Sequence, residues 1–142
     1  MKTTNFFLAI TAMVGIMFTS CTKNDLLGGD VPTSLKNTNW KLVGITDTQT
    51  GVLKKLKPTD CKQCYTFTFD TDTTALGYTV SNEMRIGGLN PILIGGTKIY
   101  EQGDAGIYYD ALFSVRSYEF KGNELKLFYD NNNKYLFYKI VH

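Results

Sequence analysis

The last quarter of the chain, from Ser117 to Ile140, alternates apolar and polar residues in short runs that are separated by turn-forming residues. Gly122-Asn123 lies between the first two runs, and both residue types tolerate the positive φ angles of a two-residue hairpin turn. Residues 130–133, with short polar side chains, separate the second run from the third. Because side chains alternate between the faces of a strand, Leu125 and Leu127 are expected to face a core together. This stretch predicts a three-stranded antiparallel meander.

Several segments upstream of the meander also have the composition of strands. The segment from Tyr65 to Phe69 has the clearest pattern, because aromatic residues alternate with threonines. We predict further strands at residues 35–45, 52–57 and 75–80. Gly87-Gly88 and Gly95-Gly96 each follow a short apolar run, which predicts bulges or tight corners. Residues 135–140 are apolar on both faces, which predicts an interior position in the sheet or a cover from another element.

Helical periodicity occurs in one segment. Four residues fall at the spacing i, i+3, i+4 and i+7 of one helix face: Tyr108, Ala111, Leu112 and Val115. Asp104 precedes them as a candidate N-terminal cap. A helix of about three turns is marginal alone, so it must be held by packing on the sheet. We therefore predict a mainly β (α+β) fold, a small antiparallel β-barrel or strongly curved sheet with one short helix packed on it.

The N-terminus has the pattern of an export signal. Lys2 supplies a positive charge and residues 6–18 carry none, but this apolar stretch is shorter than the about 20 residues of a membrane-spanning helix. Small residues then precede Cys21, which resembles the bacterial lipobox, in which the cysteine takes a diacylglycerol and becomes the new N-terminus. We predict a lipoprotein signal peptide at residues 1–20, lipidation of Cys21 and a flexible tether over residues 21–34. The alternative is an ordinary signal peptide followed by an incidental cysteine.

Residues 35–142 are enough for one hydrophobic core and too few for two. Loss of Lys2 with the signal peptide reduces the 15 basic residues to 14, against 13 acidic residues. This near-neutral balance does not favour a nucleic-acid partner, because such proteins usually carry a strongly basic face. We expect a monomeric exported bacterial lipoprotein of the cell envelope, bound through its lipid to the outer membrane on the periplasmic or surface face.

Two features of this body have a structural and a functional interpretation. Trp40 lies in an alternating strand, where a lone tryptophan is far more often a core residue than a platform for sugar stacking. Lys54, Lys55, Lys57 and Lys62 form the basic cluster of the chain. A solvated strand edge that discourages aggregation explains the cluster, and contact with anionic headgroups or glycans is the alternative.

The order of elements resembles that of META (HslJ-like) domain lipoproteins, in particular short lipoproteins of the Bacteroidetes. Three segments carry the resemblance: Leu35 to Leu42, Tyr65 to Phe69, and Tyr109 to Leu127. Many META domains have a glycine-asparagine-cysteine segment before their middle strands, and this chain has residues 77–82 there instead. The resemblance implies a compact β-rich body with one helix and no established catalytic residues, so no site residue is transferred from the family.

Cys61-Lys62-Gln63-Cys64 is the motif with the most chemical character. A thioredoxin-like site places its first cysteine at a helix N-terminus within a βαβ unit, whereas a predicted strand follows this motif directly. Zinc needs about four ligands, and no second cysteine pair or histidine lies nearby in the sequence. With Cys21 lipidated, an oxidising compartment favours a disulfide between Cys61 and Cys64. Free thiols, or a redox or metal role, are the alternatives.

The segment from Asp70 to Thr74 has the alternating acidic residues of a calcium loop. Ala75 and Ser81 stand where a helix-flanked calcium loop needs Gly and Glu, so a turn is the better explanation. Asp72-Thr73-Thr74 also resembles the acceptor sequence of Bacteroidetes O-glycosylation, which makes Thr73 a candidate for modification.

The sequence lacks the motifs of common enzyme classes. His142 is the single histidine and ends the chain, and there is no phosphate loop, nucleophile elbow or dinucleotide fingerprint. Convergence of Glu101, Asp104 and Asp110 in space is one option for a carboxylate site, and a charged solvent face explains them equally well. We expect a protein that is not an enzyme, with no catalytic residues, no metal and no cofactor.

These observations favour a non-catalytic envelope lipoprotein that acts as a binding or interaction module for an unknown protein or glycan. One alternative is an inhibitor of a secreted hydrolase, because small rigid exported β-domains suit the insertion of a loop into an active site. Another is a carrier of a small hydrophobic ligand, suggested by nine Phe and nine Tyr residues. A solidly packed interior would argue against the carrier.

Overall fold

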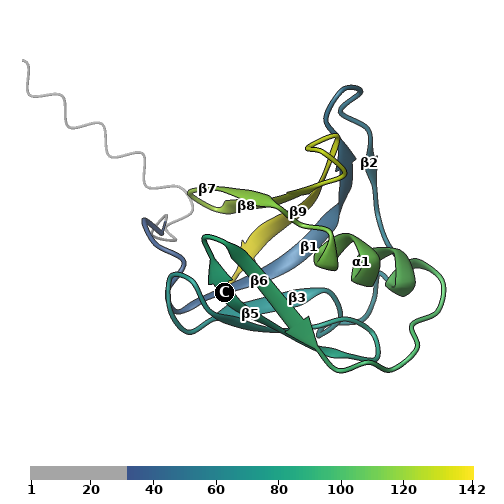
Figure 1. Cartoon of the computed structure of the whole chain (residues 1–142), viewed down its shortest axis with the longest axis horizontal. Helices are drawn as coiled ribbons and strands as arrows, with labels where there is room; N and C mark the ends of the chain where they lie inside the picture. Colours follow the sequence, from purple (N-terminus) through teal and green to yellow (C-terminus); the bar gives the residue numbers. More distant parts are fainter. Residues whose placement is uncertain (1–31) are drawn as a thin grey trace, which may run out of the picture.

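The structure is a computed structural model that describes residues 32–142 (Figure 1). The predicted signal peptide, the lipidation at Cys21 and most of the predicted tether lie outside the described residues and stay predictions. Within residues 32–142, none of the helical structure reaches the length and apolarity of a membrane-spanning segment.

The described chain forms one sheet and one helix. The elements are β1 (Thr38–Asp47), β2 (Leu53–Lys54), β3 (Thr66–Phe69), β4 (Ala75–Tyr78), β5 (Glu83–Leu89), β6 (Ile92–Gly96), α1 (Asp104–Phe113), β7 (Ser117–Lys121), β8 (Glu124–Tyr129) and β9 (Lys134–Val141). The longest connections without strand or helix are residues 55–65, before β3, and residues 97–103, before α1.

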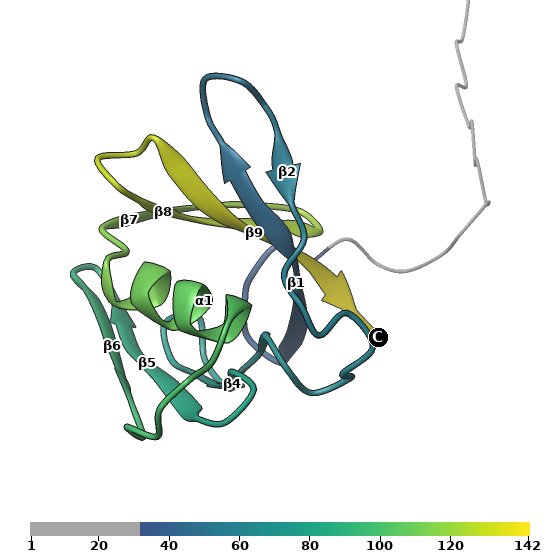
Figure 2. The same ribbon diagram turned by 90° about the vertical axis from the view of Figure 1, so that its right-hand side faces the viewer.

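The strands form one antiparallel sheet in the order β6-β5-β4-β3-β1-β9-β8-β7, and β2 pairs with β1 off this path. β6 and β7 are its two edges and do not pair with each other, so the curled sheet is a half-barrel. α1 connects these edge strands and lies across the concave side of the sheet (Figure 2). The predicted fold class is confirmed in its second form, the strongly curved sheet with one short helix packed on it.

Large side chains fill the space between the sheet and α1. The fully buried ones include Trp40, Phe67, Phe69, Met84, Tyr108, Leu112, Leu125, Leu127 and Tyr138. The indole Nε1 of Trp40 donates a 2.7 Å hydrogen bond to Thr38 Oγ1, and its ring meets Phe120 edge-on with 5.9 Å between ring centroids. Trp40 is therefore a core residue, as predicted, and the sugar-stacking interpretation is wrong because no part of the ring is exposed.

A pair of tyrosines attaches α1 to the sheet. The hydroxyls of Tyr108 in α1 and Tyr138 in β9 lie 2.8 Å apart within hydrogen-bond distance. The Tyr108 ring also packs edge-on against Tyr65, with 4.8 Å between centroids. Desolvation by burial raises the pKa of both hydrogen-bonded phenols. The helix is thus held by aromatic packing with a satisfied polar contact at its centre, as its marginal length requires.

The C-terminal meander is confirmed. Lys121 of β7 faces Glu124 of β8 across the predicted two-residue turn, and Gly122 has a φ of 60°, in the left-handed region that favours glycine. The second turn also uses positive φ, at Asp130, Asn131 and Asn132. β9 lies between β1 and β8, so the predicted interior position of the last strand is confirmed.

Two of the expected strand features differ in the structure. The strand predicted at residues 52–57 is reduced to β2: Leu53 and Lys54 pair with β1, and the chain then leaves this edge, which β3 takes further along from Thr38 to Lys41. A bulge between Ile86 and Gly88 confirms the first glycine pair as an irregularity, but Gly95 and Gly96 continue β6 in regular pairing with β5. A Cβ at Gly96 would lie 2.7 Å from Glu83 O, so close strand approach explains that glycine.

The start of α1 also differs from the prediction. Gly103 occupies the N-cap position and no side chain caps the helix, whereas Asp104 is its first residue. Asp104 Oδ2 instead accepts a 2.9 Å hydrogen bond from the backbone N–H of Lys57. The predicted apolar stripe is confirmed: Tyr108, Ala111, Leu112 and Val115 are all buried, although Val115 follows the end of the helix.

Candidate functional site

A groove of about 640 Å³ lies between α1 and residues 97–103, the segment that precedes the helix. We call it the α1 groove. Its apolar lining consists of Ile99, Tyr100, Ile107 and Tyr109, and its charged residues are Lys98, Glu101 and Asp110. The exposed fractions of Ile99, Tyr100 and Ile107 are 60 %, 84 % and 43 %. Contiguous exposed apolar side chains beside a hollow are typical of an interaction surface.

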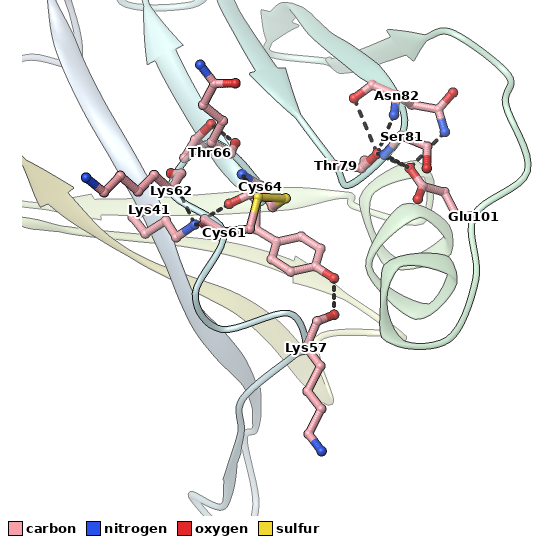
Figure 3. Close-up of a disulfide and its surroundings, with 12 residues drawn as sticks. Lys41, Lys57, Cys61, Lys62, Cys64, Thr66, Thr79, Ser81, Asn82 and Glu101 are labelled. Atoms are coloured by element: carbon pink, nitrogen blue, oxygen red, sulfur yellow. Dashed lines mark hydrogen bonds between the residues drawn. A yellow bond between two sulfur atoms is a disulfide. The ribbon is translucent and has the colours of Figure 1, made fainter.

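Glu101 lies at the base of the α1 groove and is 8 % exposed. Its Oε1 accepts hydrogen bonds from Thr79 Oγ1, from the backbone N–H of Ser81 at 3.2 Å and from Asn82 Nδ2 at 2.8 Å (Figure 3). Its Oε2 is buried and has no hydrogen-bond partner. One carboxylate oxygen therefore fixes the turn between β4 and β5, and the other is unsatisfied.

Asn82 bonds the segment before α1 to the same network. The side chain is 2 % exposed, and its Nδ2 donates to Ile99 O at 2.7 Å as well as to Glu101. Its Oδ1 accepts from the backbone N–H of Ile99 at 2.6 Å and from Thr97 Oγ1 at 2.9 Å. A single buried amide thus fixes residues 97–101 against the β4–β5 turn and shapes one side of the α1 groove.

The three acidic residues considered from the sequence do not form one cluster. Glu101 and Asp110 line the α1 groove, whereas Asp104 lines a neighbouring hollow with Lys57 and Pro58. The hydrogen bond from the Lys57 backbone, followed by the Lys54 ammonium at 3.6 Å, holds the pKa of the Asp104 carboxyl below its usual value. Within residues 32–142, no group of three or more His, Cys, Asp or Glu side chains is arranged to hold a metal ion.

Cys61 and Cys64 form a disulfide with an S–S distance of 1.98 Å, in the connection before β3 (Figure 3). The Nζ of Lys41 in β1 donates hydrogen bonds to three carbonyls of this loop, those of Cys61 (2.6 Å), Lys62 (3.3 Å) and Cys64. Desolvation by burial lowers the pKa of the Lys41 ammonium. The predicted cysteine pair is thus in a strand-flanking loop held by a lysine, without the helix N-terminus of a thioredoxin-like site.

The segment from Asp70 to Thr74 is a turn between β3 and β4, as the sequence favoured. Asp70 Oδ1 accepts a 2.6 Å hydrogen bond from Thr74 Oγ1, the main cause of the lowered pKa of its carboxyl. Asp72 Oδ1 accepts from the backbone N–H groups of Leu35 at 2.9 Å and Lys36 at 3.1 Å. These carboxylates are used within the protein, so the calcium interpretation has no support. Thr73 is exposed, and its glycosylation stays a prediction.

The remaining residues singled out from the sequence do not join a site. All four clustered lysines, Lys54, Lys55, Lys57 and Lys62, are exposed, and Lys54 forms the ion pair with Asp104. His142 is exposed at the end of the chain. The sequence did not indicate Thr79 and Asn82, and it left Glu101 open between a carboxylate site and a charged solvent face. The single signal for them was the polar pair Ser81-Asn82, which follows the predicted strand at residues 75–80.

No family model matches the chain. A protein of Tannerella forsythia, described as a "Putative lipoprotein", is 42 % identical to it over 124 residues, which cover 85 % of this chain and 84 % of that protein. The chain belongs to the same family as this lipoprotein. The predicted relation to lipoproteins is therefore supported by a relative whose similarity extends over most of both chains.

Two solved structures show the same fold at low sequence identity. A DUF4847 family protein from Bacteroides vulgatus has a TM-score of 0.55 and 17 % identity, covering 74 % of this chain and 93 % of that one. A protein from Burkholderia xenovorans has a TM-score of 0.52 and 17 % identity, covering 84 % and 97 %. At this identity they bear on the fold alone. The resemblance to META domains stays a prediction.

Proposed function

We propose that this lipoprotein is a non-catalytic interaction module of the cell envelope, attached by a lipid on Cys21, and that the α1 groove is its contact surface. The observation behind this proposal is the exposure of Ile99, Tyr100 and Ile107 around a groove of about 640 Å³. Contact with a partner would remove this apolar surface from water, which is favourable at about 25 cal/mol per Å². Export and lipid attachment are supported by membership in a lipoprotein family.

The groove is held open by buried contacts, and this supports a binding role. Asn82 and Glu101 fix the segment on one side, and the packing of Tyr108 on Tyr65 fixes α1 on the other. A surface that is already ordered loses little conformational entropy on binding. The interior, in contrast, is filled by Trp40 and the other large core side chains, which argues against the hydrophobic-ligand carrier.

The hydrolase-inhibitor alternative is favoured by a different part of the molecule. The turn after β1 is attached to the turn before β9: the Thr48 backbone N–H donates to Asn133 O at 2.9 Å, and Thr48 Oγ1 donates to Asn132 O at 3.1 Å. The two turns lie together at one end of the half-barrel (Figure 1). A pair of mutually fixed turns is a suitable shape for insertion into an active site.

A matched pair of variants tests the proposed surface. Tagged full-length chain in detergent is mixed with the solubilised envelope of its own cells, for the wild type, Ile107→Asp in the α1 groove, and Val52→Asp in the turn after β1. Val52 is 66 % exposed and outside the groove. We expect Ile107→Asp to lose a co-purifying protein that the wild type and Val52→Asp retain. Loss with Val52→Asp alone would favour the turn-based inhibitor instead.

A further inference from the structure

We propose that the α1 groove binds a peptide segment that inserts a lysine or arginine side chain toward the free oxygen of Glu101. This inference rests on the proposed function and adds the chemistry of the group that is recognised.

The two carboxylate oxygens of Glu101 are used unequally. Oε1 accepts hydrogen bonds from the β4–β5 turn, whereas Oε2 is buried without a partner. Figure 3 shows the second oxygen turned away from Ser81 and toward the helix. A buried carboxylate oxygen without a donor is costly, and the donors of the protein are already on the other oxygen. A hydrogen-bond donor that enters from the groove would satisfy it.

The groove carries more acidic than basic side chains. None of the ion pairs found in residues 32–142 includes Glu101 or Asp110, and both carboxylates line the groove together with one basic residue, Lys98. A neutral donor, such as a sugar hydroxyl, would complete the hydrogen bond and leave the charge of a buried carboxylate uncompensated. An ammonium or guanidinium supplies both the donor and the opposite charge.

Apolar side chains line the groove together with the Glu101 carboxylate. A lysine or arginine side chain has an aliphatic stem that packs on apolar surface while its charged end reaches a polar group. Ile99 and Ile107 offer such a surface, and the 84 % exposed ring of Tyr100 is available to cover a cation. Asn82 fixes the backbone of this segment, so the exposed side chains of Ile99 and Tyr100 must rotate aside to give the entering group access to Oε2.

Two peptides that differ in one charged group test the inference. Acetyl-Leu-Lys-Leu-amide and its norleucine analogue are titrated into the isotope-labelled full chain in detergent, and backbone amide shifts in residues 99–107 are followed by NMR. We expect saturable shifts with the lysine peptide and a roughly tenfold weaker affinity for the norleucine peptide, the loss typical of one charge-assisted hydrogen bond. This comparison uses the wild-type protein and needs no variant.

Variants then assign the effect to Glu101. Glu101→Gln keeps an acceptor for the β4–β5 turn but removes the charge. We expect it to lower the affinity for the lysine peptide roughly tenfold and to leave the affinity for the norleucine peptide unchanged. Asp104→Asn removes a charge outside the groove and should change neither affinity. If the wild type and Glu101→Gln bind both peptides with the same affinity, the inference is overturned and the groove is left as an interaction surface. Absence of any shift in residues 99–107 would overturn the inference, and the pull-down would then decide the proposed surface separately.

Discussion

Two polar side chains, Lys41 and Asn82, each attach an irregular connection to the sheet. Lys41 donates to three carbonyls of the disulfide loop in residues 55–65, and Asn82 bonds to the backbone of Ile99 before α1. In both cases the backbone groups of a connection without strand or helix are satisfied by one side chain. A single side chain thus supports each of the two longest connections.

Replacing Asn82 should loosen the wall of the α1 groove. Asn82→Ala removes the two hydrogen bonds that Nδ2 donates and the two that Oδ1 accepts, and it leaves the N–H and C=O of Ile99 without these partners. We expect the free energy of unfolding to fall by about 2–4 kcal/mol, measured by urea denaturation. Asn39→Ala, at an exposed position of β1, is the control and should cost less than about 1 kcal/mol. Equal losses for the two variants would contradict the role given to Asn82.

Replacing Lys41 should destabilise the disulfide loop. Lys41→Met keeps the length of the stem and removes the ammonium that donates to Cys61 O and its neighbours, so we expect a loss of about 2 kcal/mol in the free energy of unfolding. Lys55→Met removes an exposed ammonium at the start of the same connection and should leave stability nearly unchanged. A neutral effect of Lys41→Met in the same urea experiment would show that the three carbonyls do not need the cation.

Buried tyrosines should make the protein sensitive to alkaline pH. Desolvation, then the negative charges of Asp104 and Glu101, raise the pKa of Tyr65 to about 12, against about 10 in an unfolded chain. A raised folded-state pKa gives stability that is fully present below pH 10 and is lost as pH rises toward 12. We expect the free energy of unfolding to fall through this window, and Tyr65→Phe to reduce the fall. A flat profile between these pH values would contradict the burial of the phenols.

At this scale, the sequence predicts apolar residues better than polar ones. Trp40 and Leu125 could be assigned to the core because the alternation of a strand is a local pattern. Glu101 and Asn82 are separated by 19 residues, and their contact exists only because the β4–β5 turn and the segment before α1 meet in space. Nothing in the sequence near either residue indicates this pairing.

At the scale of elements, the half-barrel follows from alternation and from a helix that needs a support. The meander β7-β8-β9 and the buried face of α1 were predictable, since each depends on residues close in sequence. The shortness of β2 was not predictable, because residues 52–57 have the local pattern of a strand, whereas only Leu53 and Lys54 pair with β1. The N-terminus of α1 was also misassigned, since Asp104 bonds to Lys57 rather than to its own helix.

Close approach of β3 and β4 should make Gly77 intolerant of a side chain. A Cβ there would lie 2.3 Å from Thr66 O and 2.4 Å from Phe67 Cδ1, whereas a Cβ at Gly95 would meet nothing within 4 Å. We expect Gly77→Ala to lower the free energy of unfolding by about 1–3 kcal/mol and Gly95→Ala to leave it unchanged or slightly raised, measured by thermal or urea unfolding. The same loss of stability in both variants would show that the effect comes from strand propensity and not from the close approach of β3 and β4.

At the scale of the whole molecule, a filled half-barrel places its available chemistry on the outside. The core is occupied by aromatic and aliphatic side chains, and the contact surface that we propose lies between α1 and residues 97–103. Membership in a lipoprotein family supports attachment to a membrane. The chemistry that we propose for the partner is inferred from the residues of the groove and not from the relatives. The fold neighbours agree on the curled sheet alone.

The lipid attachment can be tested on the whole chain. Cys21→Ser should move the protein from the membrane fraction to the soluble fraction of the envelope, because it removes the thiol that is predicted to accept the lipid. The intact mass of the native protein should equal that of the chain from Cys21 with its lipid. An additional mass removed by Thr73→Ala would establish the glycosylation that the sequence suggests. Unchanged fractionation of Cys21→Ser would contradict lipid attachment at this residue.

The claim at the centre of this account is that the protein meets its partner through the α1 groove. The most direct test is photo-crosslinking in living cells, with a benzoylphenylalanine placed at Tyr100 in the groove or at Val52 in the turn after β1, two highly exposed positions. We predict one discrete crosslinked product at Tyr100, absent at Val52 and lost when Ile107→Asp is added. The same product at both positions, or its persistence with Ile107→Asp, would contradict the claim.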